Sequence, residues 1–374
     1  MSLPLVAGAL AATVVFYWLV VPARLRAGVL LALSVGALAW VAPTVAGAFL
    51  ALVVLAWLLA PRASLFAALA LVALLAFFKL VNPVVALVPP GAGWSAAVPI
   101  GLSYVVFRLI SYCVDVDRGT APRGTLAEVA LYALFLPTLL AGPVDRFGRI
   151  APQLAAPAFD LARLQFGAQR VVLGLAKKGL LADPLADALA PLYADPAATG
   201  PLVLLASAPA LAAQVYLDFS GYTDLAVGLG ALFGLQITEN FDRPWLATSV
   251  ADFWRRWHIS VMEFIRDYVF LPVFAYRPRP WKVRLGLFAT LFLFMIWHGP
   301  TWSFVLLGVW HGGAMVVWQL TQDAKRTRPG LRTALASPSG RWASRLLTLT
   351  WVSVSFLAFE LDLGALLGLP PLLP

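Results

Sequence analysis

Residues 200–234 read GPLVLLASAPALAAQVYLDFSGYTDLAVGLGALFG. The run is apolar enough to cross a bilayer as a helix, which takes about 20 residues, yet it contains Asp218 and Asp224. Carboxylates are costly at membrane depth, so they mark a functional site by default. On a helix Asp218 shares a face with Tyr222, and Ser220 with Asp224. We therefore expect a membrane helix whose polar residues serve either a site or a network between helices.

The whole chain shares this apolar character. Of its 374 residues, 61% are hydrophobic and only 12% are charged, whereas soluble domains have about 25% charged residues. With a mean hydropathy of +0.86, the chain is expected to be an all-α, multi-pass integral membrane protein. A Pro/Gly-rich connection is expected at residues 82–94. We expect about ten transmembrane helices, at residues 3–21, 27–41, 45–60, 64–82, 127–141, 165–182, 200–234, 284–298, 303–320 and 346–369.

Basic residues lie between the apolar runs. The net charge is +9, but the arginines and lysines gather in connections such as Arg24 to Arg26, Arg62 and residues 325–345, as the positive-inside rule predicts for cytoplasmic loops. This distribution argues against nucleic-acid binding. Because Arg24 to Arg26 and Arg62 mark alternate connections as cytoplasmic, the amino terminus is expected on the outer side of the membrane. We expect residues 3–21 to be a retained first helix, because the run has neither a basic region before it nor a cleavage motif after it.

Residues 236–284 differ in composition from the apolar runs around them. Within this stretch, residues 253–272 read FWRRWHISVMEFIRDYVFLP. The stretch is too charged for a lipid-exposed helix and too apolar for a loose loop, so we expect a re-entrant or interfacial assembly packed in protein. Arg255 and Arg256 either face lipid headgroups or bind the phosphates of a nucleotide-like donor.

His258, His298 and His311 are the only histidines of the chain, and Cys113 is its only cysteine. The histidines are separated by 40 and 13 residues, and neither spacing matches a zinc motif. We therefore expect no metal site and no intrachain disulfide.

Two Trp-His-Gly steps lie in residues 295–313, MIWHGPTWSFVLLGVWHGG. The Gly299-Pro300 pair is expected to break the helix directly after His298. A histidine at such a break suits acid-base chemistry, because its ordinary pKa lies near 6.5. The alternative interpretation is a buried histidine that is simply hydrogen-bonded.

The apolar run at residues 200–234 also contains Gly221, Gly228 and Gly230. These glycines are expected to allow close approach of another helix.

Several long motifs, in this order, resemble those of the membrane-bound O-acyltransferase family, and in particular its bacterial branch containing alginate O-acetylase and the D-alanyl transfer protein of teichoic acid synthesis. The resemblance covers about residues 78–313. The motifs lie at residues 99–119, 134–154, 174–186, 216–260, 266–272 (RDYVFLP) and 296–312 (IWHGPTWSFVLLGVWHG).

The resemblance implies a fold in which outer helices surround a central funnel or tunnel. Residues 1–374 are expected to form a single membrane-embedded domain, with scaffold helices at 1–90, a motif-bearing core at 95–320, and a basic loop and last helix at 321–374. Family members commonly continue with further helices beyond the last histidine. We therefore expect a reduced carboxyl-terminal part or a different acceptor partner.

The resemblance also assigns residues. His298 corresponds to the catalytic histidine and His258 to the second histidine position of the family, while His311 is expected to be structural or supporting. The residues expected to support the site are Asp218, Tyr222, Asp224, Trp297, Arg255 and Arg256.

The activity implied is O-acyl transfer in the bacterial inner membrane, with His298 as general base. Acetyl-CoA is the expected cytoplasmic donor substrate, an exported polysaccharide such as alginate the acceptor, and no cofactor is expected to be bound. The expected partners are the lipid bilayer and a periplasmic SGNH-type acyltransferase. One alternative is D-alanyl transfer from a carrier protein to teichoic acid. Alternatives of other classes are a proton-coupled transporter using Asp218, Asp224 and His298, and an inactive scaffold.

Overall fold

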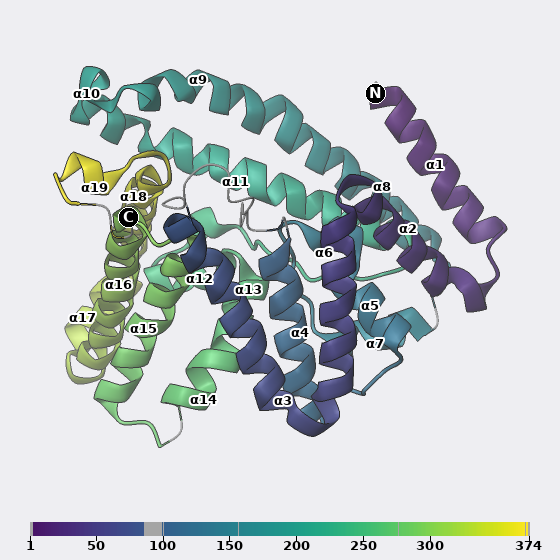
Figure 1. The fold of residues 1–374 in the computed structure, drawn as a ribbon. Helices are drawn as coiled ribbons and strands as arrows, with labels where there is room; N and C mark the ends of the chain where they lie inside the picture. Colours follow the sequence, from purple (N-terminus) through teal and green to yellow (C-terminus); the bar gives the residue numbers. More distant parts are fainter. Residues whose placement is uncertain are drawn as a thin grey trace. The chain divides into compact units, whose positions relative to one another are not determined.

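The computed structural model describes residues 3–85, 99, 101–155, 157–275, 277–370 and 372. In this part of the chain the regular structure is helical, and the one β-type feature is an isolated bridge between Phe241 and Trp257 (Figure 1). The all-α class predicted from the sequence is confirmed. The Pro/Gly-rich connection predicted at 82–94 lies, from residue 86 onward, outside the described residues.

The chain forms two compact units. The first unit comprises Met1–Phe77, Ala97–Leu175 and Gly221–Glu239, and the second comprises Phe78–Ala96, Ala176–Ser220 and Asn240–Pro374. Two long helices, α3 and α11, pass from one unit into the other. The internal boundaries predicted from the sequence remain a prediction.

The first unit contains the amino-terminal helices. Helix α5 starts at a capping box, in which the Glu128 N–H donates to Thr125 Oγ1 (3.2 Å) and the Thr125 N–H donates to the Glu128 carboxylate (2.7 Å). The helices of this unit are α1 (Leu3–Leu19), η1 (Ala23–Leu25), α2 (Arg26–Val41), most of α3 (Pro43–Val85), α4 (Leu102–Asp117), α5 (Leu126–Leu134), α6 (Leu136–Leu139), α7 (Phe147–Ala155), α8 (Leu161–Leu175) and the last part of α11 (Pro201–Leu232).

Helices α8 and α11 approach each other closely through glycines. A Cβ atom added at Gly228 would lie 2.8 Å from the carbonyl oxygen of Gly167, and one added at Gly174 would lie 2.7 Å from the carbonyl oxygen of Gly221. Only residues without a side chain permit such backbone contact. The prediction that Gly221, Gly228 and Gly230 allow close helix approach is confirmed at Gly228. At the contact with Gly221 it is Gly174 that lacks a side chain, and a Cβ atom added at Gly230 would meet Ile237, which lies outside the helices.

The second unit contains the histidine motifs. Its helices are η2 (Ala176–Ala182), α9 (Asp183–Ala194), α10 (Pro196–Thr199), the first part of α11, η3 (Pro244–Leu246), α12 (Val250–Arg256), α13 (Ile259–Ile265), η4 (Arg266–Phe270), α14 (Leu271–Phe274), α15 (Pro280–His298), α16 (Trp302–Thr327), α17 (Pro329–Ala336), α18 (Pro338–Glu360) and α19 (Leu363–Leu366). Helices α15 and α16 form an extensive contact in this unit.

Six helical segments in the described residues are long and apolar enough to span a membrane: Ala23–Val41, Pro43–Lys79, Pro201–Leu232, Pro280–His298, Trp302–Thr327 and Pro338–Glu360. The predicted number of about ten is not confirmed. Two predicted spans lie in α3, whose helical geometry is interrupted at Ala63, where its two legs meet (Figure 1). The span predicted at 127–141 is broken at Phe135 into α5 and α6.

Short helices occupy the stretch between α11 and α15. Helix α12 has seven residues, and α13, η4 and α14 follow one another without a break over residues 259–274. This run extends about 24 Å along its axis, less than the roughly 30 Å of a bilayer's hydrocarbon core. The prediction that this stretch differs from an ordinary span is confirmed, and its placement relative to the bilayer remains a prediction.

Candidate active site

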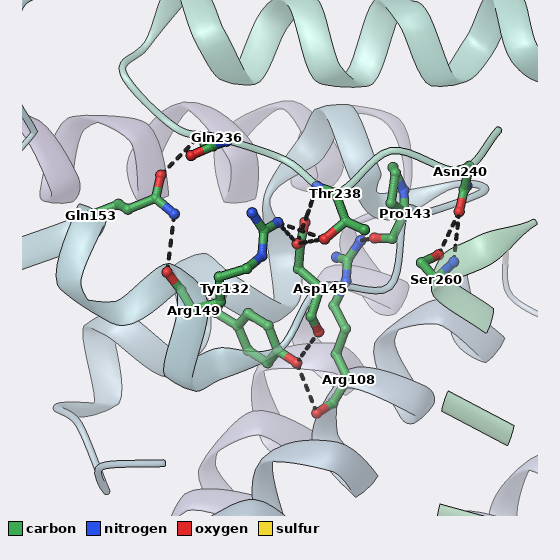
Figure 2. A network of polar contacts seen from close by, with 10 residues as sticks. All are labelled: Arg108, Tyr132, Pro143, Asp145, Arg149, Gln153, Gln236, Thr238, Asn240 and Ser260. Carbon is green, nitrogen blue, oxygen red and sulfur yellow. Dashed lines mark hydrogen bonds and ion pairs between the residues drawn. The ribbon is translucent and has the colours of Figure 1, made fainter. Parts of the chain in front are cut away.

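His258 lies at the junction between α12 and α13. It is buried, with 3% of its surface exposed, and its backbone adopts the left-handed conformation (φ 50°, ψ 46°) that non-glycine residues rarely occupy. Asn240 holds the adjoining turn: its carbonyl accepts from the Ile259 N–H (3.0 Å), and its side-chain oxygen accepts from the Ser260 hydroxyl (2.6 Å; Figure 2). Strained backbone of this kind clusters at functional sites.

His298 ends α15, as the Gly299-Pro300 pair predicts. Its ring packs among four aromatic side chains with centroid distances of 4.8 to 5.6 Å, from Trp297, Phe294, Phe304 and Phe359. The imidazole therefore lies in a largely apolar surrounding at the end of a helix.

Phe294 connects the two histidines. Its ring lies edge-on to His298, with centroids 5.2 Å apart, and to His258, at 6.3 Å. Phe219 of α11 contacts His258 on another side, at 4.7 Å. Burial, with a contribution from the nearby His298, lowers the pKa of the His258 imidazole to about 3. His258 is therefore neutral at neutral pH and can accept or donate a hydrogen bond without carrying charge.

His311 lies in a different surrounding, on α16. Its Nε2 is 3.0 Å from Ser355 Oγ on α18, and its ring lies edge-on to Trp254, with centroids 5.1 Å apart. In the described part of the chain, His311 Nδ1 is buried without a hydrogen-bond partner. These contacts are those of a residue that joins helices inside the second unit.

Asp218 and the two arginines of α12 also belong to the second unit, where each forms ion pairs. Asp218 pairs with Lys178 (2.5 Å). Arg255 and Arg256 both pair with Asp252, at 3.3 and 3.0 Å. Burial would raise the pKa of Asp252, but hydrogen bonds from the Thr248 N–H and from the two arginines hold it below its usual value. The α12 arginines are thus oriented by a charged carboxylate.

Tyr222 and Asp224 lie in the first unit. The Tyr222 hydroxyl donates to the Pro137 carbonyl (2.9 Å) and accepts from the Ala141 N–H (3.2 Å). Asp224 pairs with Arg170 (2.6 Å), which also binds Glu239 through two hydrogen bonds. The structure therefore brings His258, His298 and Trp297 together in one cluster. It places Tyr222 and Asp224 in the first unit, each in its own set of polar contacts.

Arg108 forms a further network in the first unit that motif reading did not assign. It is almost fully buried (1% exposed), and its guanidinium donates to the carbonyls of Ala133 (2.9 Å), Thr138 (2.5 Å) and Pro143 (3.1 Å). The sequence signal was an arginine inside an apolar run.

Asp145 extends the same network. It accepts from the Thr238 hydroxyl (2.5 Å) and from Arg149 (Figure 2). Its backbone carbonyl accepts from the Tyr132 hydroxyl (2.8 Å). Arg108 and Asp145 thus fix the turn between α6 and α7, through which the chain passes from one helix to the next.

An apolar cavity of about 530 Å³ lies in the second unit between α10, α11, α16, α18 and α19. Ser355, the partner of His311, is among its lining residues, whereas His258 and His298 are not. The two histidines that the sequence suggests as reacting groups therefore do not line this cavity.

Comparison with known proteins gives a consistent result. The sequence profile of the membrane-bound O-acyltransferase family matches residues 123–348. The probable alginate O-acetylase of Azotobacter vinelandii is 36% identical over 269 residues, 71% of this chain and 52% of that protein. The teichoic acid D-alanyltransferase of Streptococcus thermophilus is 29% identical over 284 residues, 70% of this chain and 68% of that protein.

The name of a third relative gives a different acceptor, peptidoglycan. The peptidoglycan O-acetyltransferase of Helicobacter pylori is 32% identical over 207 residues, 53% of this chain and 38% of that protein. This chain spans about half the length of the alginate O-acetylases that it matches.

The family profile covers more than half of the chain, and the matched part contains three of the six membrane-capable helices and the start of a fourth, together with the cluster of His258 and His298. The chain is therefore a multi-pass membrane protein that belongs to the membrane-bound O-acyltransferase family.

Proposed function

We propose that this protein is an O-acyltransferase of the bacterial inner membrane that moves acetyl from cytoplasmic acetyl-CoA toward hydroxyl groups of an exported polysaccharide. The observation that carries the proposal is the packing of His258 and His298 against one ring, Phe294, with His298 at the end of a membrane-capable helix. The names of the relatives, which include acetyl transfer to alginate and to peptidoglycan, support the acyl group and the kind of acceptor.

His298 is assigned the role of general base. Its imidazole accepts the proton of the acceptor hydroxyl while the hydroxyl oxygen attacks the thioester carbonyl carbon and a C–O bond forms. The tetrahedral oxyanion then collapses, the C–S bond breaks, and the leaving thiolate takes the proton from His298. The products are an ester and a free thiol, and the histidine returns to its neutral form.

His258 is assigned the role of orienting the acceptor. Since burial keeps it neutral, its ring can hydrogen-bond a hydroxyl group without attracting a counterion into the site. A periplasmic SGNH-type protein that completes delivery to the polymer is part of this proposal.

The test is alkali-labile acetate on cell-surface polysaccharide in a deletion strain that is complemented with variants at matched membrane levels. Native protein restores ester acetate, and His298→Gln lowers it by about 10²-fold or more, the usual effect of losing a general base. His311→Gln is the matched control, because its amide can still reach Ser355 and it changes the other Trp-His-Gly step. Equal acetate with native protein and His298→Gln would show the catalytic assignment to be wrong.

D-alanyl transfer to teichoic acid is the second candidate. The relative that favours it aligns over 68% of its own length, a larger share than in the alginate O-acetylase of A. vinelandii. The same strains decide between the two, because alkali-labile D-alanine is measured in the same hydrolysate. Restoration of D-alanine ester without acetate ester would replace the acetyl proposal by this one.

A further inference from the structure

Lys79 is a charged residue inside an apolar helix. It lies in the last part of α3, at the end of the membrane-capable segment Pro43–Lys79, and belongs to the second unit. Its side chain is half-buried, and its ammonium nitrogen lies over the ring of Trp297, 5.1 Å from the centroid. Trp297 directly precedes His298, so this lysine reaches the histidine cluster from a separate helix.

In the part of the chain that the structure describes, no carboxylate side chain neutralises this ammonium group. Within the described residues Lys79 forms no salt bridge, and the chain outside them contains no Asp or Glu side chain. Burying a charged group is costly unless the charge is paired and hydrogen-bonded, and Lys79 is partly buried. A cation–π contact offsets only part of that cost. The site therefore presents a positive charge whose missing partner is an anion.

The position of Lys79 matches the place where the proposed reaction creates negative charge. The rings of Trp297 and His298 have centroids 4.8 Å apart, so the ring beneath the Lys79 ammonium is in contact with the imidazole. A general base lies about 3 Å from the attacking hydroxyl oxygen, and an oxyanion donor lies about 3 Å from the carbonyl oxygen. A base and an oxyanion donor bind different atoms of one tetrahedral centre, so the two groups need not touch each other.

The end of α15 strengthens this argument. His298 is the last residue of a 19-residue helix, and the carboxyl end of a helix carries a partial negative charge. An oxyanion that forms beside His298 is disfavoured by this end of the helix. A cation is needed to reverse that effect, and the structure brings Lys79 to Trp297.

We propose that Lys79 is the oxyanion-stabilising residue of acyl transfer, an inference that rests on the proposed function. When the hydroxyl oxygen bonds to the thioester carbon and its proton moves to His298, the electron pair of the C=O bond moves onto the carbonyl oxygen. The Lys79 ammonium donates a hydrogen bond to that oxygen. When the C=O bond re-forms, the C–S bond breaks, the thiolate takes the proton from His298, and Lys79 is unchanged.

The first experiment separates kcat from KM in membrane vesicles containing native protein, Lys79→Met, Lys79→Arg or the control Lys325→Met, with acetate and D-alanine esters both measured. Lys79→Met lowers kcat by about 10²-fold, the effect of losing one oxyanion-hole donor, and leaves KM nearly unchanged. Lys79→Arg recovers a large part of kcat because it keeps the charge. Lys325→Met, a lysine of α16, behaves like native protein.

The second experiment does not depend on the identity of the acceptor. Purified native protein and each variant are heated in detergent with and without ethyl methylphosphonate, a tetrahedral monoanion that resembles the intermediate. The probe raises the Tm of native protein and of Lys79→Arg by mass action, but not that of Lys79→Met.

These results distinguish the two proposals. If native protein forms neither ester, the proposed function fails, while the phosphonate experiment still supports or overturns the role of Lys79. Unchanged kcat in Lys79→Met, or an equal Tm shift by the phosphonate in Lys79→Met and native protein, would overturn it. The role of Lys79 would also be overturned if Lys79→Met had a lower Tm than native protein without the probe and the fraction of unfolded protein explained its lost activity. That result would show that Lys79 is a structural residue.

Discussion

His258 and His298, 40 residues apart in the sequence, contact the same ring: their imidazoles lie 6.3 and 5.2 Å from the centroid of Phe294. One histidine follows a short helix in a left-handed turn, and the other ends a long helix. This arrangement is the structural basis of the proposed chemistry.

Replacement of His258 tests the imidazole separately from the backbone. His258→Asn is expected to fold, because asparagine tolerates the left-handed conformation at φ 50°, and to lower ester formation by at least about tenfold through loss of the ring. His258→Leu is expected to lower the Tm as well, since a bulky side chain is strained there. Full activity of well-folded His258→Asn would contradict a role for the imidazole.

The contact between α15 and α16 is expected to be sensitive at Gly308. A Cβ atom there would lie 2.7 Å from the Phe292 ring and 3.1 Å from its Cα, so Gly308→Ala should destabilise the protein by about 1–3 kcal/mol through overpacking. Gly313→Ala on the same helix is the matched control. No atom lies within 4 Å of a Cβ added there, and helix propensity favours alanine by about 1 kcal/mol. Thermal unfolding in detergent measures both, and equal Tm values would refute this packing.

The ion pair between Lys178 and Asp218 predicts a dependence on pH. Hydrogen bonds to Asp183 and Asp218 raise the pKa of Lys178. Its contribution to stability is therefore fully present below its ordinary value of 10.5 and is lost as the pH rises through the higher value of the folded state.

Asp218→Asn measures that contribution. Because both side chains are exposed, the loss should be at most about 1 kcal/mol, and the Tm difference from native protein should disappear at strongly alkaline pH. Asp183→Asn removes the other carboxylate that binds Lys178. It should lower the Tm in the same direction, and this difference should also disappear at strongly alkaline pH. A difference that grows with pH would show that the pair does not act in this way.

Loss of Arg108 should destabilise the first unit strongly. Arg108→Met removes a donor from three carbonyls. Thr138 keeps the Gly142 N–H as a second donor (3.2 Å), but the carbonyls of Ala133 and Pro143 lose the side chain that binds them, and each unsatisfied buried group costs about 1–3 kcal/mol. We expect a Tm far below that of native protein, or no folded protein in the membrane. Arg62→Met is exposed and should change stability by no more than about 0.5 kcal/mol. Comparable Tm values for both variants would rule out this role of Arg108.

The sequence by itself determined the class of protein and the local structure around His298. Apolar runs of this length are stable as helices in a lipid bilayer, so composition alone predicted membrane helices. Gly299 and Pro300 end a helix through local geometry, and the end of α15 at His298 was therefore predictable. The number of spans was not, because hydropathy does not tell an apolar run broken at Phe135 or joined at Ala63 from a separate span.

Only the tertiary structure decided which residues meet. The sequence placed Asp218 and Asp224 six residues apart on one helix, but the first pairs with Lys178 in the second unit and the other with Arg170 in the first. Lys79 and Trp297 are more than 200 residues apart, so no local pattern predicts their contact. Such contacts depend on how helices pack and on which charge lacks a counterion after packing, and neither is encoded in the periodicity of a single segment.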